Sequence, residues 1–389
     1  MPFAMRNSRS IAWFVTFCLA LAPRADAADP APDPATRAAM GEIFASLSKI
    51  LPLCLSSERF EAPGARDEVR AGLAKIAANA DALAKHADSS QADLASRGKV
   101  LAEDARHAEM RFASGRYVDA RFVALHLTES CVGCHSRLPS DKDAPFAAKL
   151  IDDSKLGDLS ASERARLAVA TRQFDKALDL YEGVLTSPPP PAGEAVRTPD
   201  LTEYLIVAIR VKRDPERAAK LLEKLEKRAE TPPDIRREIR PWLATLRRDG
   251  KALHEPPSLA HARALVESGK HVREYTYSRA GLMDDLLASS VLHRLLEDPK
   301  ISTQDRAEAY YLLGLCDAQV RSSPWLSDAS WYLATAIRTA PHTPIAMRAF
   351  GAYEDMTILA WTGSAGTDVP ADVAEDLDRL RALAQPATP

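Results

Sequence analysis

The chain has 389 residues and a formal net charge of −3, with 46% hydrophobic and 27% charged residues. This is enough apolar material for two ordinary globular domains, and the lack of a basic excess argues against nucleic acid or an anionic membrane surface as a partner. With only 16 glycines and 6% aromatic residues, the composition favours helices over sheets.

The first 27 residues have the three parts of an export signal. Arg6 and Arg9 form a basic start, residues 11–22 are an apolar run, and the small residues of the sequence Ala-Asp-Ala end at Ala27. The apolar run is shorter than the roughly 20 residues that span a bilayer. We expect cleavage near Ala27 and a periplasmic protein with no membrane span. An uncleaved anchor is the alternative.

Four helical stretches follow a proline-rich leader at 28–35. Apolar residues recur at helical spacing, and short polar or glycine-containing breaks separate the stretches. They cover about 36–57, 66–88, 92–113 and 117–137. Long helices joined by short turns are typical of an antiparallel bundle. The sequence therefore predicts an all-α protein that begins with a four-helix bundle at 36–140.

A linker at 141–160 leads into a second helical region at 161–389. Its first stretch, 162–191, has small residues, aromatic residues and a proline in helical register, namely Ala165, Ala177, Phe174, Tyr181 and Pro189. This pattern resembles the tetratricopeptide repeat (TPR). A second stretch with the same pattern lies at 309–341, and helical pairs at 200–228 and 232–270 fit it more weakly.

The resemblance implies stacked helix pairs with a concave face that binds another protein. We therefore expect a TPR-like domain that docks a partner protein. The alternative is an all-helical domain without a partner.

The sequence CVGCH at 131–135 is the chemical motif of the chain. A redox-active pair of cysteines normally follows a β-strand, and no strand is expected before Cys131. A structural zinc site needs a second pair of ligands, whereas Cys54 and Cys316 each lie alone in an apolar helical stretch and are expected in the core. A histidine directly after the second cysteine is required only by c-type haem attachment.

Haem attachment explains the spacing of the motif. Cys131 and Cys134 would form thioethers to the two vinyl groups of one porphyrin edge, and the next position would place the imidazole of His135 under the iron. Attachment occurs outside the cytoplasm, where the export signal directs the chain. The sequence thus predicts one covalent haem c.

The position of the motif, after about a hundred helical residues and with no methionine between it and Met283, resembles the class II c-type cytochromes. This is the cytochrome c prime family with its low-spin relatives. The resemblance implies His135 as the axial ligand of the iron, and a methionine of the first helix as the sixth ligand in low-spin members. Met40 matches that position, and Arg37 is placed to pair with a haem propionate.

The predicted function is electron transfer by an exported monohaem cytochrome, with a redox partner docked on the repeats. The alternatives are a haem-based binder of nitric oxide or carbon monoxide at an open sixth site, and an interaction scaffold with a structural haem. Neither a nucleophile motif nor a glycine-rich phosphate loop is present, so we do not expect an enzyme. The family resemblance also allows a homodimer.

Overall fold

A computed structural model describes most of the chain after the predicted signal peptide. The described residues are 34–54, 57–86, 92–135, 159–187, 198–273, 278–320, 328–364 and 366–386. Within them lie sixteen α-helices, a few shorter helical turns and one hairpin of two-residue strands, β1 (Thr362–Gly363) and β2 (Gly366–Thr367). The prediction of an all-α protein is confirmed. The predicted signal peptide, most of the leader and most of the linker lie outside the described residues.

Four long helices make up the first part of the structure. They are α1 (Pro34–Cys54), α3 (Arg66–His86), α4 (Ala92–Ala113) and α5 (Tyr117–His135). Their bounds lie within three residues of the predicted ones. Between α1 and α3 the chain adds the short helix α2 (Ser57–Glu61) and a 3-10 turn (Pro63–Ala65), which helical spacing did not reveal. Among the described residues, no helix is long and apolar enough to cross a membrane.

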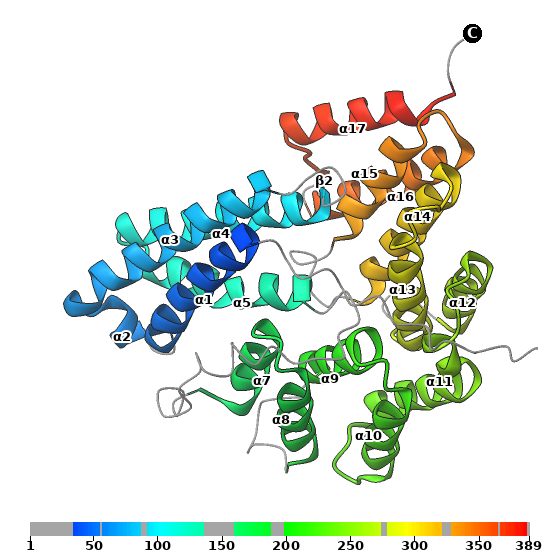
Figure 1. Cartoon of the computed structure of the whole chain (residues 1–389), viewed down its shortest axis with the longest axis horizontal. Helices are drawn as coiled ribbons and strands as arrows, with labels where there is room; N and C mark the ends of the chain where they lie inside the picture. Colours follow the sequence, from blue (N-terminus) through cyan, green and yellow to red (C-terminus); the bar gives the residue numbers. More distant parts are fainter. Residues whose placement is uncertain are drawn as a thin grey trace, which may run out of the picture.

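Polar contacts fix the direction of each long helix. Lys75 of α3 pairs with Glu42 of α1, and Arg70 of α3 pairs with Glu109 of α4 at 3.3 Å. Arg70 is early in α3 and Glu109 is late in α4, so these two helices run antiparallel (Figure 1). Helices α1 and α3 do so as well, because Gly72 lies against Ile50 late in α1 while Lys75 pairs with Glu42 earlier in it. Their apolar faces meet in one core that includes Phe60 of α2.

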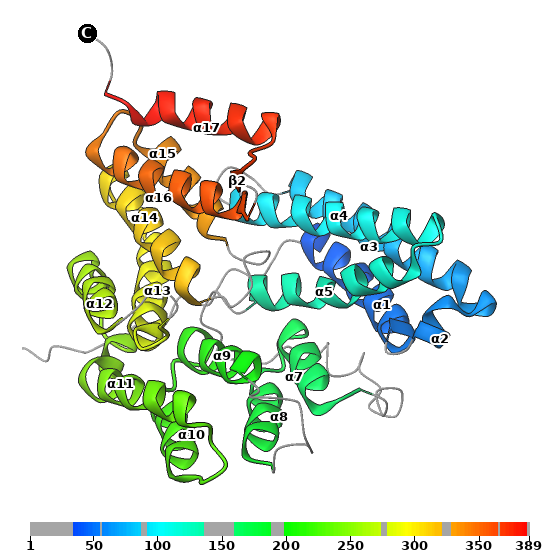
Figure 2. The same cartoon turned by 180° about the vertical axis from the view of Figure 1, so that it is seen from behind.

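The second part of the structure consists of helices that pack on one another in chain order. They are α7 (Ala161–Ala170), α8 (Phe174–Thr186), α9 (Thr198–Ile206), α10 (Pro215–Lys227), α11 (Pro233–Asp249), α12 (Leu259–Val272), α13 (Leu282–Leu296), α14 (Thr303–Val320), α15 (Ala329–Thr339), α16 (Pro344–Ala360) and α17 (Ala371–Ala384). A π-helical turn (Val207–Val211) extends α9, and a 3-10 turn (Gly250–Leu253) follows α11. Together they form a curved arc, and α5 ends in its opening (Figures 1 and 2).

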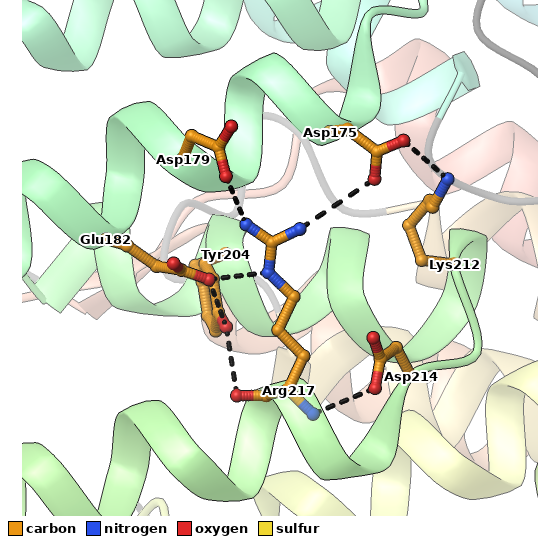
Figure 3. A network of polar contacts seen from close by, with 7 residues as sticks. All are labelled: Asp175, Asp179, Glu182, Tyr204, Lys212, Asp214 and Arg217. Atoms are coloured by element: carbon orange, nitrogen blue, oxygen red, sulfur yellow. Dashed lines mark hydrogen bonds and ion pairs between the residues drawn. The ribbon is translucent and has the colours of Figure 1, made fainter.

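An ionic network centred on Arg217 ties α8 to α10. The guanidinium of Arg217 binds Glu182 at 2.6 Å and Asp179 at 2.5 Å, and the hydroxyl of Tyr204 donates to the same Glu182 carboxylate at 3.0 Å. Asp214 accepts from the backbone N–H of Arg217 at 2.8 Å and so begins α10. Figure 3 shows these side chains converging from three consecutive helices.

Helix α13 lies at the centre of the arc, because every residue from Leu282 to His293 is buried. Two of its polar side chains, Asp284 and Ser289, are hydrogen-bonded, whereas the buried hydroxyl of Ser290 has no partner among the described atoms. Asp284 accepts from Thr245 at 2.9 Å and from Arg248 at 3.1 Å, and Ser289 accepts from the fully buried Arg210 at 2.7 Å. Buried polar groups are tolerated when they are hydrogen-bonded in this way.

The two parts of the structure meet at both ends of the arc. At one end, Leu51 of α1 and Leu167 of α7 form a buried cluster with Leu159, against which Phe44 and Leu125 pack. At the other end, Arg97 of α4 forms an ion pair with Asp328, just before α15. Leu159 belongs to the predicted linker, yet it contributes to this junction.

The closest approach of α3 and α4 is at Gly98. A Cβ there would lie 2.9 Å from both the carbonyl oxygen of Ala80 and the backbone nitrogen of Ala84. We expect Gly98→Ala to lower the free energy of unfolding by about 1–3 kcal/mol, since the two backbones must separate. The control is Gly41→Ala on α1, where no atom lies within 4 Å and a gain of about 0.4–1 kcal/mol is expected. Urea denaturation measures both changes, and similar effects of the two substitutions would contradict this packing.

Candidate functional site

The candidate site is the last turn of α5. The helix begins after a turn in which Gly115 adopts a φ of +78°, and it ends at His135. Cys131 and His135 are four residues apart and therefore share one face of the helix. Cys131 is half-buried, and its Sγ donates to the carbonyl of Leu127 at 3.5 Å. Cys134 lies on the same turn, and its side chain is outside the described part of the structure.

Helix α5, which ends at His135, packs against α7. The residue keeps partial contact with solvent, but its Nδ1 atom is buried and has no hydrogen-bond partner among the described atoms. Burial lowers the pKa of His135 to about 4, and the nearby Arg172 charge lowers it further. Hydrogen bonding to the backbone of Ala170 and Val169 opposes both effects. The ring is thus neutral at pH 7, the form that binds a metal.

Met40 and Arg37 lie on α1, one turn apart. Met40 is half-buried and packs against the core of the long helices, which Cys131 also borders. Arg37 is exposed. Met40, the predicted sixth ligand, and Arg37, the predicted partner of a haem propionate, therefore both lie on α1. This helix is in contact with α5.

The antiparallel pairing of α1 with α5 sets the height of Met40. Arg121 of α5 donates to the carbonyl of Cys54, the last residue of α1, at 3.0 Å. Met40 lies fourteen residues before Cys54, and His135 lies fourteen residues after Arg121. At about 1.5 Å per residue, each is displaced by about 21 Å in the same direction. Met40 and His135 therefore lie on the same side of this contact, toward the same end of the two helices.

The other cysteines lie elsewhere. Cys54 and Cys316 are both fully buried, as predicted, and burial raises the pKa of the Cys54 thiol to about 12. The carbonyl of Cys54 contacts Arg121 of α5. Arg121 lies ten residues before Cys131, which corresponds to about 15 Å along α5. Cys316 is on α14. Neither of them can complete a metal site with Cys131.

The remaining candidate ligands lie outside this turn. His107 and Met110 are exposed on α4, as expected of residues without a ligand role. The side chains of His86 and His126 are outside the described part. The sequence did not reveal the contribution of α7, since its contact with His135 joins residues some thirty-five positions apart. The one local signal for α7 in the sequence is the Ser160–Glu163 capping box, which marks where the helix begins.

The donor set fits a c-type haem. A cysteine thiol, an imidazole and a thioether sulfur are the groups that such a haem requires for attachment and axial ligation. A buried ring nitrogen with no partner among the described atoms is available to a metal.

No protein-family model, curated protein or solved structure matches this chain. The function is therefore inferred from the chemistry of the last turn of α5 and from the helices around it.

The leucine cluster between α1 and α7 is testable by a double-mutant cycle. Leu51 and Leu167 belong to the same buried cluster, so we expect Leu51→Ala and Leu167→Ala to be coupled by about 0.5–3 kcal/mol in urea denaturation. The control cycle pairs Leu51→Ala with Leu178→Ala. Leu178 is equally buried but belongs to the core of the arc, and its effect should add to that of Leu51→Ala within about 0.5 kcal/mol. Additivity in both cycles would show that the two parts are not packed together here.

Proposed function

We propose that this protein is an exported monohaem c-type cytochrome that transfers electrons. One haem c is attached through Cys131 and Cys134, His135 is its axial ligand, and Met40 is the sixth ligand. The four long helices form the cytochrome bundle, and the arc formed by α7 to α17 is a TPR-like domain that docks a redox partner.

The observation that carries this proposal is the CVGCH motif in the last turn of α5, with a neutral and largely buried imidazole. Helical spacing sets Cys131 and His135 on one face, so a porphyrin bound to the cysteine has the imidazole beside it. When bound, the haem supplies a one-electron couple. The residues of α5 hold it covalently and orient the ring of His135.

The sixth ligand is argued from the pairing of α1 with α5. Met40 and His135 lie on the same side of the contact between Arg121 and Cys54, and Met40 borders the same core as Cys131. Methionine paired with histidine raises the reduction potential of a haem, which suits an electron carrier. Arg37, one turn before Met40, is exposed and could reach the carboxylates of a haem held between the two helices.

The arrangement of helices in the arc supports the proposed docking of a redox partner. The predicted helical pairs at 162–191, 200–228, 232–270 and 309–341 each coincide with two consecutive helices. Helices that follow one another around a curve present an extended inner surface, which repeat proteins use for binding. Because α5 ends in the opening of the arc (Figures 1 and 2), a partner held there would lie close to the haem.

Covalent attachment is the first test. After expression of the full chain in a host that matures c-type cytochromes, we expect haem to remain with the denatured protein on a gel stained for haem. Cys131→Ala and Cys134→Ala should each weaken or abolish this signal, because each removes one thioether. Cys316→Ala, which changes a buried cysteine of α14, should retain it. A wild-type chain without covalent haem would refute the proposed function.

Ligation by Met40 is tested by the visible spectrum of the haem protein, oxidised and reduced, with and without carbon monoxide. We expect a low-spin wild type that is indifferent to carbon monoxide. Met40→Ala should become high-spin and bind the gas, because the sixth position is opened. Met110→Ala changes a methionine that is 55% exposed on α4 and should behave as wild type. A high-spin wild type that takes up carbon monoxide would favour the gas-binding alternative.

A further inference from the structure

An exposed apolar surface lies at the end of α16. Among the described residues, nine large hydrophobic side chains are exposed, and four of them lie on α16 or directly after it, namely Met347, Ile358, Leu359 and Trp361. Leu359 is 67% exposed and Trp361 is 44% exposed. Met347, Gly351 and Ile358 share one face of the helix, and a Cβ placed on Gly351 would meet no atom within 4 Å. The outer face of α16 thus carries apolar side chains and has open space beside Gly351.

The hairpin of β1 and β2 brings an acidic residue back to this surface. The backbone N–H of Asp368 donates to the carbonyl of Trp361 at 3.0 Å. On the helix itself, Asp355 precedes Ile358 by three positions and Leu359 by four, so these side chains are neighbours on the helix surface. Asp355 and Asp368 are both exposed, and neither forms an ion pair within the described part of the chain. Two such acidic residues therefore lie at the edge of the apolar surface.

The charge around this surface has one sign. Residues 349–378 include seven Asp and Glu and no Lys, Arg or His, whereas the whole chain has 54 Asp and Glu and 51 Lys and Arg. Arg381 neutralises part of the local charge, because it binds Glu354 at 2.8 Å and Asp378 at 2.6 Å. The last carbonyls of α16 add the partial negative charge of a helix C-terminus. The surface therefore has an apolar centre in negative surroundings.

We propose that Ile358, Leu359 and Trp361, which we call the α16 patch, dock the redox partner, and that this partner is a basic protein with Lys or Arg around an apolar centre. The inference rests on the proposed function and deepens it, since it names the docking surface and the charge of the partner. Helix α16 belongs to the end of the arc that meets the bundle through the ion pair of Arg97 and Asp328. In Figures 1 and 2 the hairpin after α16 lies beside the start of α4. A partner docked here would contact the arc next to the bundle that carries the proposed haem.

Charge complementarity favours this occupant over two others. Protein interfaces combine apolar or aromatic side chains at the centre with a polar rim, and opposite charges on the two partners speed their association. A second copy of the chain has the same net charge of −3 and is repelled at long range. An anionic membrane surface is repelled by the same carboxylates. A basic protein surface matches both the apolar centre and the acidic edge.

The experiment measures binding of the full-length haem protein to a small basic c-type cytochrome that has lysines around its exposed haem edge. Isothermal titration calorimetry at low and high salt gives the dissociation constant, which we expect to rise with salt. Leu359→Ser should weaken binding about tenfold or more, because an apolar side chain is lost from the centre of the interface. Asp355→Asn combined with Asp368→Asn should weaken binding about threefold to tenfold and reduce its salt dependence.

The control variants change matched side chains elsewhere. Val118→Ser alters a side chain that is 68% exposed at the start of α5. Glu103→Gln combined with Glu216→Gln removes two exposed carboxylates from α4 and α10. Both controls should bind as wild type does, and a probe with acetylated lysines should not bind.

Three outcomes would overturn the inference. The first is a wild type that does not bind the basic probe, and the second is equal binding by the patch variants and their controls. The third is self-association of the wild type in sedimentation velocity that Leu359→Ser abolishes, because a second copy would then cover the patch.

The result can be separated from the test of the proposed function. A chain without covalent haem refutes the function, and its binding to the basic probe can still be measured. A haem protein that does not bind the probe refutes only the role of the α16 patch. If Leu359→Ser fails to fold, the variant of Asp355 and Asp368, which changes only exposed carboxylates, provides the same test.

Discussion

The pairing of α1 with α5 is the constraint on which the candidate site depends. The hydrogen bond from Arg121 to the carbonyl of Cys54 joins the end of α1 to the beginning of α5. Because both helices are regular, this contact places Met40 and His135 toward the same end of the two helices. A shift by one turn would move Met40 by about 5.4 Å relative to His135. The relative placement of the two predicted ligands thus depends in part on a contact about 21 Å away from them.

The second constraint is the junction between the two parts of the chain. Leu51, Leu159 and Leu167 are buried together, and burial of such side chains is worth about 1.5–3 kcal/mol each. This packing holds α7 against α5. Burial is the main cause of the low pKa of His135, and the other causes come from residues at the end of α7. The arc therefore influences the protonation of that ring.

Local pattern predicted the long helices within three residues, because apolar spacing, caps and breakers act over a few positions. The turn that joins Cys131 to His135 was predicted for the same reason. The burial of Leu159 was not, since a polar stretch of sequence gives no sign of a contact with α1. The effect of Arg172 on the pKa of His135 was also missed, because it arises only when α7 packs on α5. What the sequence left open are contacts between distant segments, which depend on tertiary packing rather than on spacing.

The environment of His135 has an energetic consequence. Its Nδ1 atom is buried and without a partner in the described part of the chain, and such an atom costs about 1–3 kcal/mol. The ring is kept neutral by burial first and by Arg172 second, so no proton has to leave before a metal binds. A group that bonds to this ring in the native chain but not in the unfolded one would offset that cost and stabilise the fold. The folded chain thus keeps this imidazole neutral in a largely buried environment.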